Sequence, residues 1–344
     1  MTTISSLPNE LLVAIAVAGK EHNEAENWEM HSTTWKAEWT LSHLSRRFSN
    51  VIIGAPELWA LVEMVSGKGS VEILELLCLE RSRAYKISII LRQSSLPHHW
   101  AYQIVPHLSR ILTTIQSLRI ALRTDDALEM LMDSLRDIAA PRLQHLEVVC
   151  ITEEHNHVGF GAITIFLSGA PRLSFLKIDG FMLQLPALPL LTASLTHLEL
   201  RTAQYCDPDI DRIAAITAQC PFLARLHLDI TFESVAHNRF HIPTLKFLYI
   251  SISEFEDSDF LPKNLDSFDT PALTELIVGG THGDQISQLL SLTGLPHSSF
   301  PALLSLSFAL ACTDSCPCET DPDSLPFLTI SSPRPSSPYC LISP

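Results

Sequence analysis

The segment PRLSFLKI (residues 171–178) carries the pattern that decides the fold: Leu-x-x-Leu-x-aliphatic, with a proline two residues before the first leucine. Eight copies or near-copies lie between residues 115 and 308, and six of them have the proline. Successive copies start 22 to 30 residues apart. A pattern that returns at this interval predicts a solenoid, because a single unit cannot bury its own apolar face and neighbouring units must stack. The copies are Ile115-Leu118-Ile120, Leu143-Leu146-Val148, Leu173-Leu176-Ile178, Leu195-Leu198-Leu200, Leu223-Leu226-Leu228, Leu245-Leu248-Ile250, Leu273-Leu276-Val278 and Leu303-Leu306-Phe308.

The spacing is similar to that of leucine-rich repeats, slightly over-long in places. This resemblance implies an α/β solenoid over residues 111–311 with a parallel sheet on its concave face. Leucine-rich repeats also carry an asparagine or cysteine eight positions after the first leucine. Here that position holds Arg123, Ile151, Phe181, Ala203, Thr231, Ser253, Thr281 and Ala311. We therefore expect an irregular solenoid without the asparagine ladder.

Composition narrows the classes of partner. The 344 residues are 46% hydrophobic and 18% charged, which is enough to build a large core. The formal charge of −15 repels phosphate backbones and anionic lipid, so we expect neither nucleic acid nor a membrane as partner. No stretch has the length of a membrane span, and Asn9 and Glu10 stand where a secretory signal needs basic residues. We expect an intracellular protein with free thiols.

The N-terminal residues 1–65 differ from the repeats. Pro8 and Glu10 suit the start of a helix, which we expect to end near Gly19. Residues 19–40 form an acidic insertion with three tryptophans, and its pattern leaves a loop and a weak helix equally open. A second helical pattern follows over 41–54. Residues 66–110 are predicted to be a linker into the solenoid, with a helix at 71–83 and a strand at 84–91.

Within the repeats, the longer units have room for helices, for example over 125–139. The prolines are expected to close the segment before each strand, because the residue before a proline avoids the helical region. Residues 312–344 are rich in proline and serine, which predicts a disordered tail. Leu325-Leu328-Ile330 in that tail is a possible frayed ninth copy of the phrase.

The N-terminus also resembles an F-box, over roughly residues 4 to 62. The resemblance rests on LPNELLVAI (7–15), LSHLSRRF (41–48) and PELW (56–59). It implies a small helical bundle that docks on the linker subunit of an SCF-type ubiquitin ligase, and through it on the cullin scaffold. The following repeats would then select a protein substrate. By motif position, the docking contacts would come from Leu7, Pro8, Ile15, Leu44, Phe48 and Trp59.

Two other interpretations of this module remain open. The apolar side chains can instead form the bundle's own core, which we prefer for Leu11, Leu12 and Val51. The module can also be an N-terminal cap on a repeat protein that binds its partner without a ligase. The insertion between residues 19 and 40 departs from the family and would weaken docking if it distorted the bundle.

Residues that flank the inward pair of each strand are expected to point out of the concave face and to bind the substrate. They are Phe175, Lys177, Asp179, His197, Glu199, Arg201, Arg225, His227, Asp229, Phe247 and Tyr249. Charges of both signs beside aromatic rings are typical of a specific protein-binding surface. The alternative is an ordinary solvated strand surface that binds nothing.

No catalytic motif, cofactor site or metal site is predicted. Cys312, Cys316 and Cys318 lack a fourth ligand, and the group of Glu153, Glu154, His155 and His157 is better explained as a polar loop. The sequence therefore predicts a binding protein rather than an enzyme.

Overall fold

The structure is a computed structural model of the chain. It describes residues 7–26, 44–55, 58, 61–65, 88–92, 108, 112–122, 125–150, 165–180, 193–201, 210–229, 239–251, 265, 267–281, 300–310, 327–331 and 341–343.

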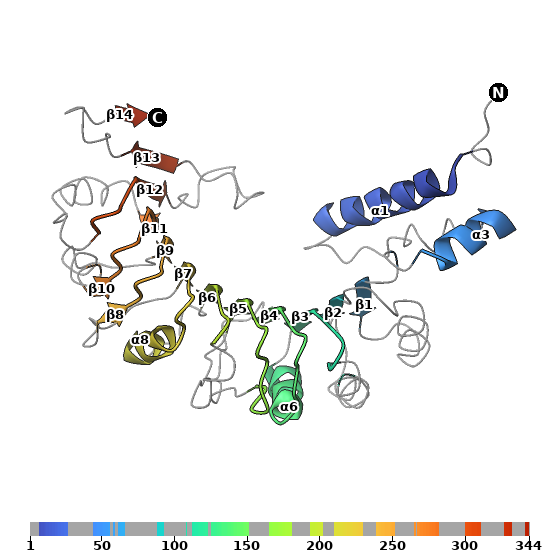
Figure 1. Cartoon of the computed structure of the whole chain (residues 1–344), viewed down its shortest axis with the longest axis horizontal. Helices are drawn as coiled ribbons and strands as arrows, with labels where there is room; N and C mark the ends of the chain where they lie inside the picture. Colours follow the sequence, from blue (N-terminus) through green and yellow to red (C-terminus); the bar gives the residue numbers. More distant parts are fainter. Residues whose placement is uncertain are drawn as a thin grey trace.

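One curved sheet of twelve strands dominates the described residues (Figure 1). Its order is β1-β2-β3-β4-β5-β6-β7-β9-β11-β12-β13-β14, and all neighbours are parallel up to β12. The strands are β1 (Leu61–Val65), β2 (Ser88–Arg92), β3 (Ser117–Leu122), β4 (His145–Cys150), β5 (Phe175–Asp179), β6 (His197–Arg201), β7 (Arg225–Asp229), β9 (Phe247–Ser251), β11 (Glu275–Thr281), β12 (Ser305–Leu310), β13 (Phe327–Ser331) and β14 (Leu341–Ser343). Strands that follow one another in sequence and pair in parallel define a repeat solenoid, so this part of the prediction is confirmed.

The register of the sheet explains the leucine pattern. The second leucine of each phrase pairs with its counterpart in the next strand, from Leu118 in β3 to Leu306 in β12. The aliphatic or aromatic residue two positions later forms a parallel row from Ile120 to Phe308. Every member of both rows is at most 9% exposed. Each strand thus depends on its neighbours to keep its apolar side dry.

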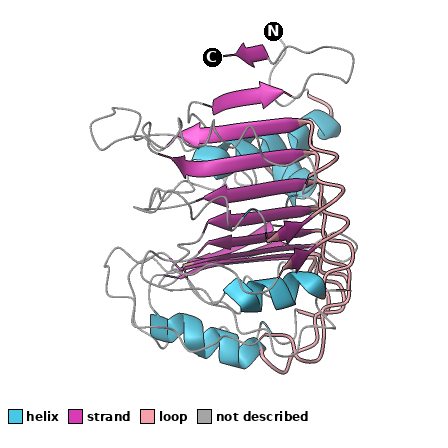
Figure 2. Ribbon diagram, turned by 90° about the vertical axis from the view of Figure 1, so that its left-hand side faces the viewer, coloured by secondary structure: helices cyan, strands magenta, loops and turns pink. Residues whose placement is uncertain are grey.

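The prolines have a more specific role than the sequence analysis assigned to them. In six units the residue before the proline accepts a hydrogen bond from the leucine three positions on, at 3.0–3.2 Å, as from Leu173 N–H to Ala170 C=O. These are β-turns with proline at the second position, where its fixed φ suits the turn. The residue before each proline is itself buried, for example Ala140 and Thr270. The turns lie one behind another along one side of the sheet (Figure 2).

A hydrogen-bonded ladder links these turns. The carbonyl of the residue just before each strand accepts two backbone N–H groups from the next unit, for example Gln144 C=O from Ser174 and Phe175. The pattern runs through seven acceptors, from Gln116 to Thr274, at 2.8–3.0 Å. Hydroxyl groups of Ser174, Thr196 and Thr274 reinforce it by donating to the same carbonyls. Backbone N–H and hydroxyl groups therefore satisfy the carbonyls of the turns, in a chain that lacks the asparagines of leucine-rich repeats.

Helices cover the convex side of the sheet. Helix α6 (Asp125–Leu135) precedes β4 and α8 (Ile210–Ala218) precedes β7, and both lie outside the curve (Figure 1). A small parallel sheet of β8 (Phe240–His241) and β10 (Phe268–Asp269) lies next to α8, with the rings of Phe240 and Phe268 stacked at 4.3 Å. The helix predicted over 125–139 is thus present but ends at Leu135.

Among the described residues, two helices precede the sheet, α1 (Asn9–Glu26) and α3 (Arg46–Ile53). The prediction that the first helix ends near Gly19 is wrong, because α1 continues for seven residues beyond it. A glycine inside a helix costs only about 1 kcal/mol relative to alanine, and the following Lys-Glu-His-Asn-Glu-Ala-Glu contains no residue that stops a helix. Residues 27–43, which hold the rest of the insertion, lie outside the described residues.

Three other segments refine the predicted domain boundaries. β1 lies within the 1–65 module of the sequence analysis yet pairs with β2 as part of the solenoid sheet. β2 agrees with the strand predicted at 84–91, whereas the helix expected at 71–83 lies outside the described residues. In the 312–344 tail, β13 and β14 pair antiparallel at the end of the sheet, so β13 is not a ninth parallel unit. The other residues of that tail are not described.

No helix in the described ranges is long and apolar enough to cross a bilayer.

Candidate functional site

The concave face consists of three rows of side chains that run across the strands. The first row is Ser117, His145, Phe175, His197, Arg225, Phe247 and Glu275; the second is Arg119, Glu147, Lys177, Glu199, His227, Tyr249 and Ile277; the third is Ala121, Val149, Asp179, Arg201, Asp229, Ser251 and Gly279. All eleven residues predicted to bind a substrate lie in these rows. In β5, β6 and β7 they alternate with the buried leucine rows and are half-buried or exposed. Their placement agrees with the expected alternation, and their role in binding stays a prediction.

Charges of opposite sign alternate along the second row. Glu147 is only 4% exposed and contacts Arg119 on β3 and Lys177 on β5, with Lys177 Nζ 3.5 Å from Oε1. Lys177 Nζ also lies 3.7 Å from Glu199 Oε2 on β6. His145 on the same strand brings Nε2 to 3.7 Å from Glu147 Oε2. The row is therefore a chain of ion pairs that crosses four neighbouring strands.

Burial by itself would raise the pKa of Glu147. The neighbouring His145, Arg119 and Lys177 outweigh that effect and lower the pKa to about 2. Glu147 is therefore ionised at neutral pH, in a place where an isolated carboxylate would not be.

The third row contains an acid, a base and an acid in register. Arg201 on β6 pairs in the sheet with Asp179 on β5 and Asp229 on β7. Burial raises the pKa of Asp179, and Arg201 and Lys177 oppose the rise. The charges of this row partly neutralise one another across adjacent strands.

Planar side chains follow one another along the first row. The rings of His145 and Phe175 stack at 4.1 Å and 3°, and the rings of Phe175 and His197 lie 6.2 Å apart. The guanidinium of Arg225 lies 5.3 Å from the ring centroid of Phe247. Burial and the nearby Arg225 lower the pKa of His197. The row thus places the rings of His145, Phe175 and His197 one after another and the cation of Arg225 against the ring of Phe247.

His227 and Tyr249 form a second aromatic pair, stacked at 4.0 Å. Burial, with Arg201 and Lys177 nearby, lowers the pKa of His227 to about 3. Burial and the charge of Asp229 raise the pKa of Tyr249. Its ring lies directly over Gly279, where a Cβ would come within 2.9 Å of Tyr249 Cζ. Gly279 therefore makes room for Tyr249, which the presence of a glycine inside a strand could have signalled.

The helical pair α1–α3 is the second candidate surface. Arg47 joins the two helix starts, because Nη2 donates to Leu7 C=O at 2.6 Å and to Asn9 Oδ1 at 2.9 Å. A small core of Ala16, Ile52, Ala55 and Leu58 holds the helices together, separate from the core of the solenoid.

The predicted docking residues of this pair divide between exposed and buried positions. Pro8, Ile15 and Leu44 are exposed, with Ile15 at 47% and Leu44 at 58%, and Leu7 is half-buried. Phe48 is buried, at 3% exposure, whereas Trp59 lies outside the described residues.

Two further apolar side chains of the pair are exposed. Leu11, which the sequence analysis assigned to the core, is 49% exposed, and Ile53 is 42% exposed. The spacing of apolar residues in the sequence did not predict their exposure. The side of each helix that faces the other depends on how the two helices cross.

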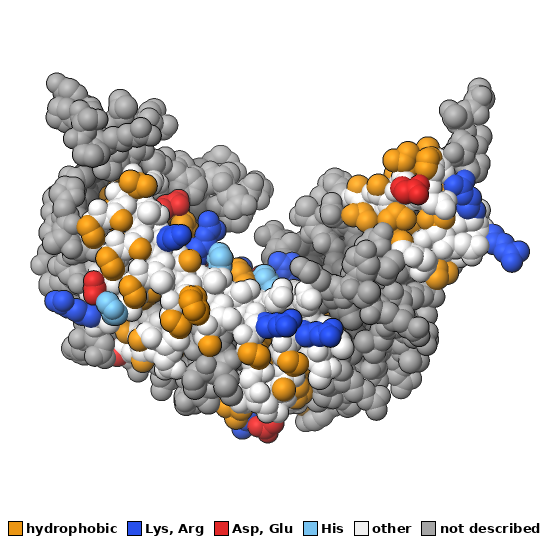
Figure 3. All heavy atoms as spheres, viewed as in Figure 1, with side chains coloured by type: hydrophobic (Ala, Val, Ile, Leu, Met, Phe, Trp, Pro, Cys, Tyr) orange, Lys and Arg blue, Asp and Glu red, His pale blue; other side chains and the backbone are white. Residues whose placement is uncertain are grey.

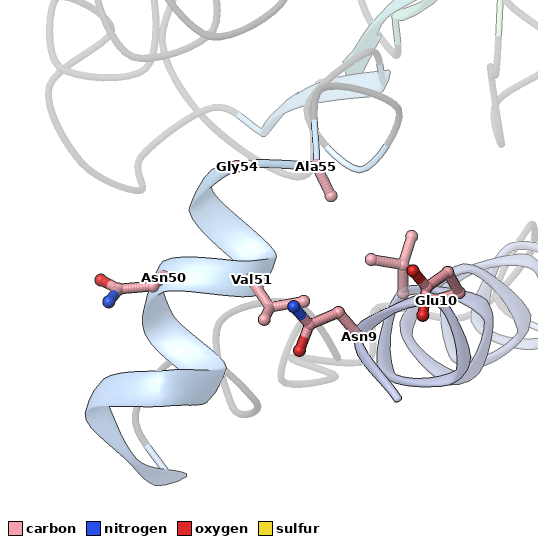
Figure 4. A pocket seen from close by; sticks show the side chains of 7 residues that line it. Asn9, Glu10, Asn50, Val51, Gly54 and Ala55 are labelled. Atoms are coloured by element: carbon pink, nitrogen blue, oxygen red, sulfur yellow. The ribbon is translucent and has the colours of Figure 1, made fainter. Parts of the chain in front are cut away.

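An open depression of about 590 Å³ lies between the two helices. Asn9, Glu10 and Val13 of α1 line one side, and Asn50 and Val51 of α3 line the other, with Val51 and Asn9 facing each other (Figure 4). It is shallow and contains one ionisable side chain, Glu10, which suits a protein contact better than a small-molecule site.

Among the described residues, no group of three or more His, Cys, Asp or Glu side chains could hold a metal ion. The Cys312, Cys316 and Cys318 group and the Glu153–His157 group lie outside those residues.

No known protein family matches the sequence, and no curated protein matches it. Among solved structures, a chain of the yeast Rad7 and Elc1 complex is similar to this one. The two share 12% identity with a TM-score of 0.38, over 86% of this chain and 87% of the other. A TM-score this low does not establish a common fold, so the solenoid assignment rests on the strand order itself.

Proposed function

We propose that this protein is the substrate-recognition adaptor of an SCF-type ubiquitin ligase. The helical pair docks on the linker subunit, and through it on the cullin scaffold, while the concave face holds a protein target. The observation that carries the proposal is the exposed apolar surface of the pair, formed by Leu11, Ile15, Leu44 and Ile53. It accompanies the sequence resemblance to an F-box, whose motifs include Leu11, Ile15 and Leu44.

Docking on a partner would remove the exposed apolar side chains of the two helices from water, which lowers the free energy of the complex. Each Å² of apolar surface removed from water contributes about 25 cal/mol, and exposed leucine and isoleucine side chains on two adjacent helices suit an apolar groove. The core of the pair is small, so a partner would also stabilise the helices themselves.

The adaptor would act by tethering and would perform no bond chemistry of its own. Holding a target near the ubiquitin carrier raises the effective concentration of its lysines. A rigid concave face suits this task, because the ion pairs of the second row fix its side chains before a target arrives.

Co-purification with the linker subunit tests the proposal. Leu44→Asp places a charge in the docking surface and is expected to reduce the recovered linker at least about tenfold, since a buried unpaired charge costs several kcal/mol. Leu304→Asp is the matched control, because Leu304 is an equally exposed leucine, at 65%, on the far end of the solenoid. Failure of the unmodified chain to recover the linker would refute the ligase role.

A ligase-independent repeat protein is the second candidate. α3 ends at Ile53 and β1 begins at Leu61, so the helical pair lies at the open end of the sheet, where a cap would lie (Figure 1). In that case the unmodified chain, Leu44→Asp and Leu304→Asp would all fail to recover the linker.

A further inference from the structure

We propose that the edge of the solenoid formed by the proline turns binds an extended acidic segment of the protein target. We call this edge the turn ledge and define it by Arg142, Arg172, Phe222, Arg225 and Lys246. The inference rests on the proposed function in one respect, namely that the repeats hold a protein.

Equivalent positions in successive units place these residues along one edge. Arg142, Arg172 and Phe222 are each the third residue of a proline turn, in the units of β4, β5 and β7. Lys246 immediately precedes β9 and Arg225 opens β7. Because the turns follow the register of the sheet, all five lie at the ends where the parallel strands begin (Figure 2).

All five side chains are exposed, and Phe222 is 61% exposed. Figure 3 views this side of the molecule and shows Lys and Arg side chains gathered over the middle of the solenoid.

The cations of the ledge differ from those in the second row of the concave face. Lys177 and Arg119 in the second row are paired with Glu147. By contrast, Arg142, Arg172, Arg225 and Lys246 form no ion pair with any residue that the structure describes. Two of them, Arg142 and Arg172, occupy the same position in neighbouring turns, where like charges repel. A ligand carboxylate would relieve that repulsion, whereas a paired cation has little to gain.

The charge of the ledge also opposes that of the whole chain. The formal charge of the protein is −15. A cationic edge on an acidic chain favours an acidic partner there and repels it elsewhere, which sets the orientation of binding.

The spacing of the ledge selects the shape of the ligand. Neighbouring strands lie about 4.8 Å apart, so the four intervals from β4 to β9 span about 19 Å. An extended chain rises about 3.3 Å per residue, so about six residues cover that length. The cations come from two pairs of neighbouring units, Arg142 with Arg172 and Arg225 with Lys246, so they are spread along the ledge and are not gathered around one point as they would be for a single phosphate. Carboxylates spread along a peptide therefore match them better.

The apolar component of the ligand follows from the rings nearby. Phe222 lies in the ledge, and Phe175 and Phe247 of the first row lie in the strands that follow the same turns. We therefore expect the segment to combine aspartate or glutamate with leucine or aromatic residues.

Selection from a random ten-residue peptide library with the intact chain as bait tests the inference. The expected result is enrichment of peptides that combine several carboxylates with leucine or aromatic residues. A fluorescein-labelled member should then bind Arg172→Glu about tenfold more weakly than the unmodified chain, and its affinity should fall with salt. Arg172→Lys should retain most of the affinity.

Arg136→Glu is the control, because it makes the same change of charge just beyond α6, on the convex side. Arg136 pairs there with the exposed Asp133 at 2.5 Å, and the affinity for the peptide should change less than about twofold. Unchanged circular dichroism melting of Arg172→Glu would confirm that the variant folds.

Several outcomes would overturn the inference. Selected peptides that are neutral or basic, equal affinity for Arg172→Glu, or no enrichment at all would each do so. Tighter binding of a labelled single-stranded 20-nucleotide DNA than of the peptide would assign the ledge to nucleic acid instead. Recovery of the linker subunit with Arg172→Glu is a separate measurement. Failure of peptide binding would therefore refute the role of the ledge without refuting the ligase role.

Discussion

At the scale of single residues, Glu147 shows how a half-buried sheet surface holds charge. A carboxylate on this strand face loses hydration, and cations on both neighbouring strands replace the lost water. The same alternation of sign continues to Glu199, so Glu147 and Lys177 each lie between two charges of the opposite sign. The row keeps the concave face polar without leaving the carboxylate of Glu147 unpaired.

Glu147→Gln should therefore destabilise the protein by about 2 kcal/mol, because it leaves Arg119 and Lys177 without their shared carboxylate. Urea unfolding at pH 7, followed by circular dichroism, measures the loss. Glu199→Gln is the matched control: its side chain is 27% exposed and has one contact at 3.7 Å, so its loss should stay below about 1 kcal/mol. Equal losses would show that the second row is ordinary solvated surface.

His227 gives the concave face a pH dependence. Its pKa is about 3 in the folded protein, against 6.5 for an unperturbed histidine, mainly because burial disfavours the charged ring. Between pH 3 and pH 6.5 the ring of His227 is protonated in the unfolded chain but neutral in the folded protein. The contribution of the neutral His227 to the free energy of unfolding is therefore complete above pH 6.5 and is lost as the pH falls toward 3.

From pH 6.5 to pH 5 we expect His227 alone to reduce the free energy of unfolding by roughly 1.5 kcal/mol. Glu147 contributes little in this window, because its unfolded value is 4.5 and its loss begins below that pH. Urea titrations at pH 5, 6 and 7 should show a shallower decline for His227→Gln, with His197 contributing to the slope that remains. A decline of the same size in both proteins would exclude His227 as its source.

At the scale of elements, the proline turn is the unit that repeats most faithfully. The lengths between phrases vary, yet each turn makes the same hydrogen bond and each pre-strand carbonyl accepts the same two donors. These bonds use backbone groups, so they do not require the asparagine that leucine-rich repeats carry at another position. Proline reduces the entropy that each turn loses on folding.

This regularity explains which elements could be predicted from the sequence. The leucine rows, the parallel strands and the residues of the concave face could be predicted. Side chains alternate with a period of two within each strand, and the same leucine phrase recurs from one strand to the next. Aligning the phrases also gives the cross-strand neighbours of Lys177 and Glu199. Glu147 and Arg119 were not among the candidate residues, although the same alignment places them in the adjoining strands.

Other features did not follow from the repeated leucine phrase. α1 runs through Gly19 because no residue after it favours a helix end over continuation. β1 joins the sheet although its five residues lack the repeated phrase, because an open sheet edge offers it backbone partners. Phe48 is buried and Leu11 is exposed, the reverse of the roles that the sequence analysis assigned to them.

At the scale of the whole molecule, the described residues form two hydrophobic cores. One runs through the solenoid from Ile89 to Phe308, and the other joins Ala16, Ile52, Ala55 and Leu58 in the helical pair. In a solenoid each unit contacts only its neighbours, so stability is a sum of units and their interfaces. Damage to one unit should therefore spread to adjacent strands and leave the separate core intact.

Hydrogen exchange read by mass spectrometry tests this division. Leu248→Ala removes a fully buried side chain from β9, a change that costs roughly 2–5 kcal/mol. It should accelerate hydrogen exchange in β7, β9 and β11, while α1 and α3 keep their protection. Ile52→Ala should do the reverse, loosening α1 and α3 but not those strands. If Leu248→Ala exposed the helices as much as the strands, the two cores would unfold as one cooperative unit. The helical pair would then depend on the solenoid for its stability, as a cap does, and would have less need of a partner to stabilise it.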